Sequence, residues 1–581
     1  MKVLLLHPND SAEVGPWREV RWDWIVDLGW SGRSGYEHLS KLLGCRIFSL
    51  QDVLNHEQHG TQVREFLRAG LGQVIDEEGV DWWDVFSPLP YDRIEQALLV
   101  SGLARQIPPD AEIAATRPHS LTQGLSVLLG REIKVFVADS GSALGKRLVR
   151  YRKAAATFRP SQILQIALDK WDTDFRYRRH ISPAASASTQ PTILLPSSYV
   201  NVSKVQVAYA RMLPEQKFLL ATTRPSGSHL DRPPNVDLRS LASYAPKPFL
   251  PATEKDHVQL LQRWSHAQSK VFPLNEALHL SQQLGVLSEF PAFLRKGLRI
   301  RDAWRNVFAR EPIQAVLSAD ENNPYTRLPS LLARSRKIPT LFVDHGALNM
   351  TFAVRELISD TYLVQGEMAK DYIVNFCGVP EHRVKVGSPV SEKELKATVN
   401  TERRDWIVFF STNYALSAGR TEVLYRETIP NLCTLARQTQ RKVIIKLHPF
   451  ESFAERSRLV EELLTPEQRP WVELREGSLT PDLLDRAWFT LTVESSVAVE
   501  SALQGVPCFL CEWFDCSWYE YGTQFAKFSV AQTLNSPENI LDIPRLIEGS
   551  QLSPTVKERL VQYISPQNLS LLLSDPLARH Q

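Results

Sequence analysis

The sequence predicts an α/β protein made of parallel, doubly wound sheets. Short apolar runs recur along the chain, and segments in which apolar residues follow helical spacing separate them. Strands buried on both faces read as continuous apolar runs, so these runs fit parallel sheets better than an antiparallel sandwich. The runs begin with Lys2–Leu6 and continue with CRIFSL, EIAAT, IKVFVA, TILLPS, FLLATT, QAVLSA, TLFVDH and TYLVQG. After residue 405 a further alternation gives WIVFFST, VIIKLHP, WVELRE, WFTLTVES and CFLCEW.

Length and composition restrict the classes of protein to consider. The 581 residues exceed the usual size of one hydrophobic core, and 43% hydrophobic and 23% charged content is typical of globular proteins. The 67 basic and 65 acidic residues lack the basic excess of a dedicated nucleic-acid binder. The six cysteines do not follow zinc-site spacing, and no apolar run reaches about 18 residues. We therefore expect a cytoplasmic protein, or one that is peripheral at the inner face of the membrane.

Two polar stretches divide the chain. Residues 181–192 are rich in Ser, Ala and Pro, and residues 388–405 lack an apolar face. A third segment, 225–252, is rich in Pro and predicts a long loop. The predicted parts are an N-terminal Rossmann-like α/β portion at 1–185, a Rossmann-like lobe at 186–390, a second such lobe at 391–550 and a helical tail at 551–581.

The first candidate site residues follow the run VIIKL. In parallel sheets, ligands bind beyond the carboxyl ends of the strands, and His448-Pro449 stands at such an end. Pro449 has the φ that is favoured in the first turn of a helix. His448 is therefore a candidate hydrogen-bond donor to a phosphate. The alternative is that His448 only satisfies a local backbone group.

A second motif lies one βα unit later, where the run FTLTV is followed by Glu494-Ser495-Ser496 and a helix. Two serines at a helix start supply hydroxyls and backbone N–H groups, which together favour an anion. Glu500 projects from the same helix face as Ser496, so its carboxylate can accept hydrogen bonds from ribose. Gly505 suits the position just after the helix. The alternative is a simple serine N-cap with a solvated glutamate.

The segments KLHPFE and ESSVAVESALQGVP resemble the donor lobe of the GT-B superfamily of glycosyltransferases. They are most similar to bacterial capsule and surface-polysaccharide enzymes, namely sialyltransferases, Kdo transferases and CDP-glycerol polymerases. The resemblance implies two Rossmann-like lobes facing a cleft, with the portion before residue 186 as an addition. It also implies that His448, with Pro449, contacts donor phosphate or ribose, that Ser495 and Ser496 contact phosphate, and that Glu500 contacts ribose.

The activity that this resemblance implies is transfer of a sugar from a cytidine or uridine nucleotide-sugar to a surface-polysaccharide or glycolipid acceptor. The transfer is expected to be inverting and metal-independent, with no cofactor other than the nucleotide-sugar substrate. Two alternatives stay open. A sugar-nucleotide epimerase of the same fold would need no acceptor, and a catalytically silent sugar-binding scaffold would bind nucleotide weakly.

Acidic and histidine residues follow two further predicted strands. Asp320 and Glu321 follow QAVLSA, and Asp344-His345-Gly346 follows the run LFV. A similar strand followed by His-Gly occurs in the acceptor lobe of the same polysaccharide enzymes. His345 is thus the first candidate for the general base of an inverting transfer, with Asp344, Asp320 and Glu321 as alternatives. His345 otherwise only shapes the loop, because Gly346 permits a tight turn.

Three other sequence patterns are weaker evidence for a function. Asp172-Thr173-Asp174 matches a short metal-binding pattern in helical surroundings that do not suit a metal loop, so we predict no essential metal. GSALGKR at 141–147 lacks the spacing and the hydroxyl of a phosphate loop. Residues 146–179 are basic, which indicates a solvated helix face first, and an anionic membrane or glycan next. Nucleic acid is not expected, since the chain supplies no matching motif.

Overall fold

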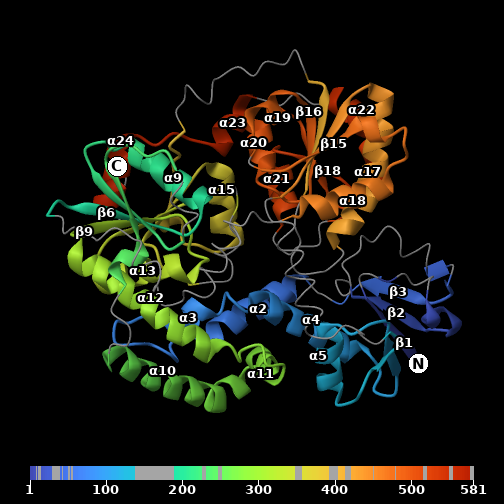
Figure 1. Ribbon diagram of the computed structural model, residues 1–581, viewed down its shortest axis with the longest axis horizontal. Coiled ribbons are helices and arrows are strands. Elements are labelled where there is room, and N and C mark those ends of the chain that lie inside the picture. Colours follow the sequence, from blue (N-terminus) through green and yellow to red (C-terminus); the bar gives the residue numbers. More distant parts are fainter. Residues whose placement is uncertain are drawn as a thin grey trace. The chain divides into compact units, whose positions relative to one another are not determined.

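Figure 1 shows the computed structural model of the chain, which falls into two compact units. The first unit comprises Met1–Gly60, Glu95–Thr157 and Lys396–Lys557, and the second comprises Thr61–Ile94, Phe158–Leu395 and Glu558–Gln581. The structure describes residues 1–7, 10, 15–28, 40, 41, 43–49, 53, 56–137, 189–224, 230–245, 251–346, 348, 356–390, 404–411, 420–448, 451–477, 479–514, 520–548 and 554–575.

Three parallel sheets share one winding order. Their strand orders are β3-β2-β1-β4-β5, β12-β11-β10-β9-β6-β7-β8 and β15-β14-β13-β16-β17-β18. In each sheet the chain starts in the middle, adds two strands toward one edge, and then returns to build toward the other edge. Every strand pair in these sheets is parallel. This is the Rossmann order. It confirms the predicted α/β class with two Rossmann-like sheets and an additional N-terminal one.

The N-terminal sheet belongs to the first unit. Its second strand, which the sequence analysis did not predict, begins at Trp24. Trp17 and Trp22 precede it and are buried, and Trp22 Nε1 donates to the Trp17 carbonyl at 2.8 Å, so these tryptophans serve packing. The elements are β1 (Lys2–Leu6), η1 (Pro16–Glu19), β2 (Trp24–Asp27), β3 (Arg46–Ser49), α4 (Tyr91–Gln106), β4 (Glu112–Ala115), α5 (Ser120–Leu129) and β5 (Lys134–Val135).

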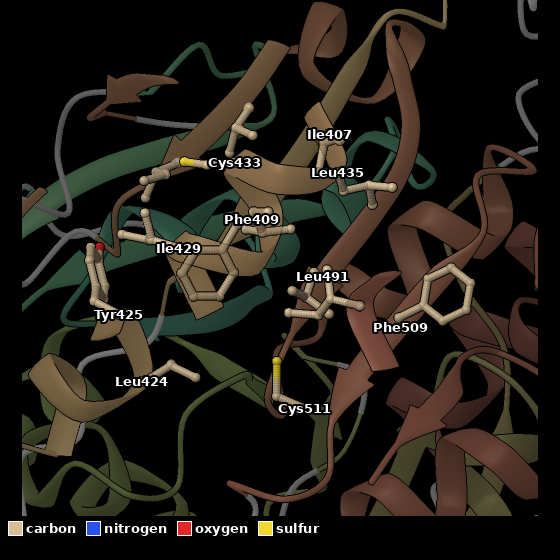
Figure 2. Packing of buried hydrophobic residues seen from close by; sticks show 14 of the residues in the cluster. Ile407, Phe409, Leu424, Tyr425, Ile429, Cys433, Leu435, Leu491, Phe509 and Cys511 are labelled. Carbon is tan, nitrogen blue, oxygen red and sulfur yellow. The ribbon is translucent and has the colours of Figure 1, made fainter. Parts of the chain in front are cut away.

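The C-terminal sheet of the first unit has a continuous apolar core on one face. Ile407, Phe409 and Leu491 from the strands pack with Leu424 and Ile429 of α17, and all five are buried (Figure 2). The elements are β13 (Trp406–Phe410), α17 (Arg420–Thr439), β14 (Lys442–Lys446), α18 (Phe453–Leu463), η9 (Arg469–Trp471), β15 (Val472–Arg475), α19 (Pro481–Asp485), β16 (Ala487–Thr492), α20 (Val497–Leu503), β17 (Cys508–Cys511), α21 (Tyr521–Lys527), β18 (Gln532–Leu534), η10 (Pro537–Asp542) and α22 (Ile543–Glu548).

The sheet of the second unit corrects one prediction. The Pro-rich segment 225–252 was expected to be a loop, but it contains β8 (Val236–Ser240), which pairs with β7 at the sheet edge. Most of β8 is only half buried, as expected of an edge strand, so it lacks the continuous apolar run of the inner strands. The other strands are β6 (Thr192–Ser197), β7 (Lys217–Thr222), β9 (Ile313–Ser318), β10 (Thr340–Val343), β11 (Thr361–Val364) and β12 (Val384–Val386).

Helices cover both faces of this sheet. Figure 1 shows α9 and α24 on one side and α13 on the other. The helices are α9 (Val200–Arg211), η5 (Leu241–Tyr244), α10 (Pro251–Lys270), η6 (Phe272–Leu274), α11 (Glu276–Gln283), α12 (Phe290–Arg310), α13 (Pro324–Ser335), α15 (Glu367–Asp371), η7 (Tyr372–Phe376) and η8 (Glu381–Arg383).

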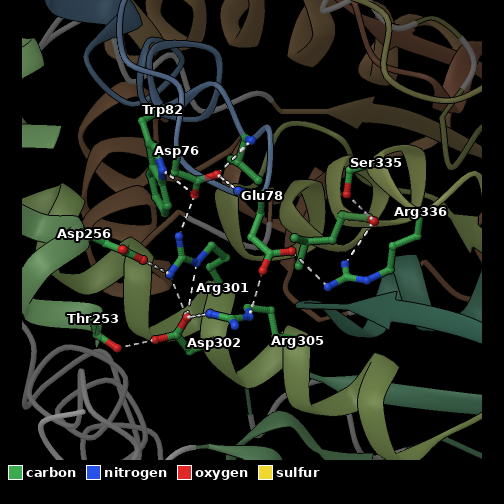
Figure 3. Close-up of polar contacts among 12 residues, drawn as sticks. Asp76, Glu78, Trp82, Thr253, Asp256, Arg301, Asp302, Arg305, Ser335 and Arg336 are labelled. Atoms are coloured by element: carbon green, nitrogen blue, oxygen red, sulfur yellow. Dashed lines mark hydrogen bonds and ion pairs between the residues drawn. The ribbon is translucent and has the colours of Figure 1, made fainter. Parts of the chain in front are cut away.

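An early segment of the chain is built into the second unit. It contains part of α2 (His56–Ala69) and all of α3 (Trp82–Phe86), and α3 packs against α12 and α13. Arg301 of α12 donates to Asp76 at 2.7 Å, and Trp82 Nε1 donates to the same carboxylate at 2.9 Å (Figure 3). Because Asp76 and Arg301 are both buried, this ion pair attaches residues 61–94 to α12.

The end of the described chain, from Glu558 onward, belongs to the second unit. It contains the last residues of α23 (Pro554–Leu560) and all of α24 (Pro566–Ser574). Between them the backbone runs beside β12, where Ser388 N–H donates to Gln562 at 2.7 Å and Ile564 N–H donates to Ser388 at 3.1 Å. Leu569 and Leu572 of α24 then enter the core of the sheet.

Candidate functional site

His448 lies at the carboxyl end of β14, where it is half buried. Its backbone N–H donates to Glu451 Oε2 at 2.9 Å, and Glu451 Oε1 pairs with Arg456 Nε at 2.8 Å. The Glu451 side chain is fully buried, so it fixes the turn that follows the strand. Burial lowers the pKa of the His448 imidazole, against a raising effect of Glu451 and with a further lowering effect of Lys446. The imidazole is therefore neutral at neutral pH.

Lys446 is a buried cation beside His448 that the sequence analysis did not select. Its Nζ donates to the carbonyl oxygens of Leu447 at 2.9 Å and Gly477 at 2.6 Å. Burial lowers the pKa of this ammonium, while Glu451 and Glu476 raise it. A lysine in the last position of β14, two residues before His448, was the available signal. A positive charge at a strand end favours an anion nearby.

Ser495 and Ser496 lie between β16 and α20. Ser495 Oγ accepts the N–H of Val497 at 3.3 Å, which matches the simpler capping role. Ser496 is the N-cap residue and is exposed, and its side chain caps no helical amide. Glu500 is exposed one turn further along α20. Gly505 has φ of 64°, which is the left-handed conformation expected just after the helix.

Thr492, the last residue of β16, was also missed. It is fully buried, and its Oγ1 has no hydrogen-bond partner among the described residues. β16 neighbours β13, the first strand of this sheet, so Thr492 lies at the point where the strand order reverses. Ligands of doubly wound sheets bind at this point. A buried hydroxyl without a partner carries an energetic cost.

The donor-site candidates gather at one edge of one sheet. His448 follows β14 and Ser495 follows β16, and β13 lies between these two strands. Adjacent strands are about 4.8 Å apart, so two strand spacings separate the two positions by about 10 Å. This span suits a nucleotide phosphate and its ribose. Pro449, the remaining candidate of this group, lies outside the described residues.

Asp344 and His345 follow β10 in the second unit. Asp344 is buried, and its Oδ1 accepts the N–H of Gly346 at 3.2 Å. Its Oδ2 has no hydrogen-bond partner within the described part of the chain. Burial raises the pKa of Asp344 to about 6, although His345 and the amides of Gly346 and His345 lower it. His345 is exposed. A carboxyl group with this pKa suits a general base near neutral pH.

Asp320 and Glu321 already have structural partners. Asp320 Oδ1 accepts the N–H groups of Asn322 at 2.9 Å and Asn323 at 3.2 Å. Glu321 accepts hydrogen bonds from the hydroxyls of Ser359 and Tyr362. Both carboxylates are buried, and these contacts hold the turn that leads from β9 into α13. Of the four candidate bases, Asp344 is thus the buried one with an unpartnered oxygen.

A pH-dependent stability measurement tests the state of Asp344. The folded pKa of about 6 exceeds the ordinary value of 3.8, so the folded state binds the proton more tightly. Stability contributed by this proton is present below pH 3.8 and is lost as pH rises through 6. Asp344→Asn should therefore raise the free energy of unfolding by up to about 3 kcal/mol at pH 7.5 and change it little at pH 4. Urea unfolding at both pH values measures this, with Asp110→Asn at an exposed position as the control. An equal effect of Asp344→Asn at both pH values would contradict it.

Some predictions fall outside what the structure describes. The basic segment 146–179, which includes Asp172 and Asp174, lies among the residues left undescribed, so its role stays a prediction. No described helix combines the length and apolar character needed to cross a membrane. Within the described ranges, no group of three or more His, Cys, Asp or Glu side chains is arranged to hold a metal ion. Metal independence and the lack of a cofactor stay predictions.

Comparison with known proteins gives likeness in structure alone. No protein-family model and no curated protein matches the chain. The UDP-GlcNAc 2-epimerase from Methanocaldococcus jannaschii matches with a TM-score of 0.41 and 12% identity, over 66% of this chain and 99% of that one. MnaA from S. aureus, solved with UDP, matches with a TM-score of 0.41 and 12% identity, over 67% of this chain and 97% of that one. MurG from Acinetobacter baumannii matches with a TM-score of 0.36 and 12% identity, over 66% of this chain and 99% of that one. These are GT-B fold proteins. At these TM-scores, the fold class of this chain rests on its own strand order.

Proposed function

We propose that this protein is a GT-B glycosyltransferase that moves a sugar from a cytidine or uridine nucleotide-sugar to a surface-polysaccharide or glycolipid acceptor. The observation that carries the proposal is that His448 and Ser495 follow strands on either side of β13 at the carboxyl edge of one Rossmann-ordered sheet, with Ser495 at the reversal point of the strand order. Such a point is where doubly wound sheets hold nucleotides. The sequence motifs around His448 and Ser495 fit the same use.

In the proposed donor site, the neutral His448 imidazole donates a hydrogen bond to phosphate or ribose. Lys446 supplies positive charge nearby, and Ser496 presents an exposed hydroxyl at the start of α20. Glu500 accepts from the ribose hydroxyls. These groups would stabilise the negative charge that the nucleotide acquires as it leaves.

In the proposed transfer step, a base removes the proton of the acceptor hydroxyl. The acceptor oxygen forms a bond to the anomeric carbon, the bond from that carbon to the phosphate oxygen breaks, and the nucleotide leaves with the bonding electrons. Because attack and departure occur on opposite faces, the configuration inverts. Asp344 takes the proton in this scheme, with His345 as the alternative base, and each would have to reach that hydroxyl when the acceptor is bound.

Nucleotide-induced thermal stabilisation tests the donor site before any acceptor is known. We expect CMP, CDP or UDP to stabilise the protein by about 3 kcal/mol at a hundredfold excess over the Kd, because the ligand binds only the folded state. His448→Ala and the Ser495→Ala/Ser496→Ala double variant should each lose most of this shift. Ser457→Ala on the exposed side of α18 is the control and should keep it. A cooperative unfolding transition that no nucleotide shifts would contradict the proposal.

Product analysis separates the transferase from an epimerase of the same fold. A transferase releases free nucleotide in proportion to the sugar transferred, or slowly releases it by hydrolysis when only water is present. An epimerase converts the nucleotide-sugar into its isomer and releases no nucleotide. A protein that binds nucleotide but does neither would be a sugar-binding scaffold.

A further inference from the structure

Two cations and two tyrosines meet at the carboxyl edge of the sheet in the second unit. Tyr199 follows β6, Arg224 follows β7, and Tyr325 stands in the first turn of α13, which follows β9. Lys296 reaches the group from α12. We refer to these four residues as the cationic cluster. β6 lies between β7 and β9, and the step from β6 to β9 is the point where the strand order of this sheet reverses.

The contacts within the cationic cluster are specific. Arg224 donates a hydrogen bond to the Tyr199 hydroxyl at 2.7 Å. Its guanidinium carbon lies 4.8 Å from the centre of the Tyr199 ring and 5.7 Å from that of Tyr325. Lys296 Nζ lies 5.1 Å from the centre of the same Tyr325 ring. One aromatic ring therefore has two positive charges beside it.

No carboxylate of the described residues lies within ion-pair distance of Arg224 or Lys296. The acids that follow β9 are already occupied, since Asp320 accepts backbone amides and Glu321 accepts hydroxyls. Arg327 on α13 provides the contrast, because both oxygens of Asp84 accept from it at 2.7 Å. The Tyr325 ring attracts both cations but supplies no formal negative charge. An anion that contacts Arg224 and Lys296 would supply the missing counter-charge.

The backbone around the cationic cluster is fixed in advance. Ser198 and Thr223, which directly precede Tyr199 and Arg224, are buried and share a hydrogen bond of 2.6 Å. This bond ties the loop after β6 to the loop after β7. The amides at the start of α13 are engaged as well, because Asn323 Oδ1 accepts the N–H of Tyr325 at 3.0 Å. Recognition of an anion would therefore come from the side chains of Arg224 and Lys296.

We propose that the cationic cluster binds the oxyanion of the acceptor, so that the acceptor is an acidic saccharide. The group that the cluster would recognise is a carboxylate or a phosphate attached to a sugar. The inference rests on the proposed transferase function, since it assigns the second unit to the acceptor. It narrows the acceptor class from saccharides in general to those that carry a negative charge near the reacting ring. Tyr199 is partly exposed and offers apolar surface beside the anion for that ring.

The experiment is a calorimetric titration of the full chain at low salt. Trigalacturonate is the probe that carries carboxylates, glucose 1-phosphate is the probe that carries a phosphate, and maltotriose is the neutral probe. We expect one or both anionic probes to bind and maltotriose not to bind. The Arg224→Gln/Lys296→Gln double variant should lose at least about tenfold in affinity, because charge-assisted hydrogen bonds contribute about 1.5 kcal/mol or more. Arg295→Gln removes a charge from an exposed position next to Lys296 and should change the affinity less than twofold.

The outcomes separate this inference from the donor-site proposal. Equal binding of anionic probes by the wild type and the double variant, or no binding of either anionic probe, would overturn the inference. Loss of nucleotide stabilisation in the double variant would also overturn it, because the cluster would then hold the donor. If the wild type binds anionic probes through the cluster but no nucleotide stabilises it, the donor-site proposal fails and the anion site stands. Unchanged unfolding midpoints show that the variants fold.

Discussion

Replacing Arg301 by Ala is expected to lower the free energy of unfolding by about 4 kcal/mol. The guanidinium is buried and contacts three carboxylates, with Asp76 and Asp256 at 2.7 Å and Asp302 at 2.9 Å. Removing it leaves three acids within a poorly hydrated region without their counter-ion. Breaking a buried ion pair by deleting one partner typically costs 3–5 kcal/mol, because the remaining charge stays desolvated.

Urea unfolding at pH 7 measures this loss, and Arg305 supplies a control on the same helix. Arg305 also contacts Asp302, at 3.3 Å, and Glu78, at 3.1 Å, but its side chain is 44% exposed (Figure 3). Arg305→Ala should therefore cost less than about 1 kcal/mol. Arg301→Lys keeps the charge but loses the planar fork, so it should fall between the two. Equal losses for Arg301→Ala and Arg305→Ala would contradict the buried network.

Most inner strands were predictable because burial on both faces leaves a continuous apolar run. β2 is the exception, an inner strand that was missed because its run is only four residues long and ends in Asp27. The other missed strands lie where the rule weakens. β8 is a half-buried edge strand, and β18 has only three residues, two of which are not buried. The placement of residues 61–94 was not predictable at all. It depends on the contact between Asp76 and Arg301, which are 225 positions apart, and no local pattern records such a pairing.

The candidate sites show the same division. His448 and Ser495 could be selected as candidates because each lies just after an apolar strand, and strand ends in parallel sheets share one edge. The status of Glu321 depends on hydroxyls that come from Ser359 and Tyr362, so the sequence alone could not tell a structural acid from a base. The cationic cluster was missed because its members come from four separate segments, and each one alone looks like an ordinary surface residue.

Replacing Leu572 by Ala is expected to cost about 3 kcal/mol, which would show that the C-terminal helix belongs to the core of the second unit. Leu572 is fully buried in the cluster that contains Ile193 and Leu317 of the sheet and Val207 of α9. Deleting a buried leucine side chain removes its transfer energy and leaves a cavity, and such changes typically cost 2–5 kcal/mol. The neighbour Leu571 is 40% exposed, so Leu571→Ala should change stability by less than about 1 kcal/mol.

These two adjacent leucines have the same size and the same helix propensity, so only their orientation differs. A large loss of unfolding free energy at position 572 and a small one at position 571 would require α24 to pack against the sheet with Leu572 facing the core and Leu571 facing outward. Similar small losses at both positions would mean that α24 is not held against the sheet in solution. Limited proteolysis adds a second readout, because an undocked α24 would expose the segment between α23 and α24 to the protease. In the docked state the chain before this segment is tightly packed, since a side chain at position 366 in place of Gly366 would collide with the backbone of Leu560. Wild-type protein should therefore resist cleavage between α23 and α24, and the Leu572→Ala variant should be cut there faster than the Leu571→Ala variant.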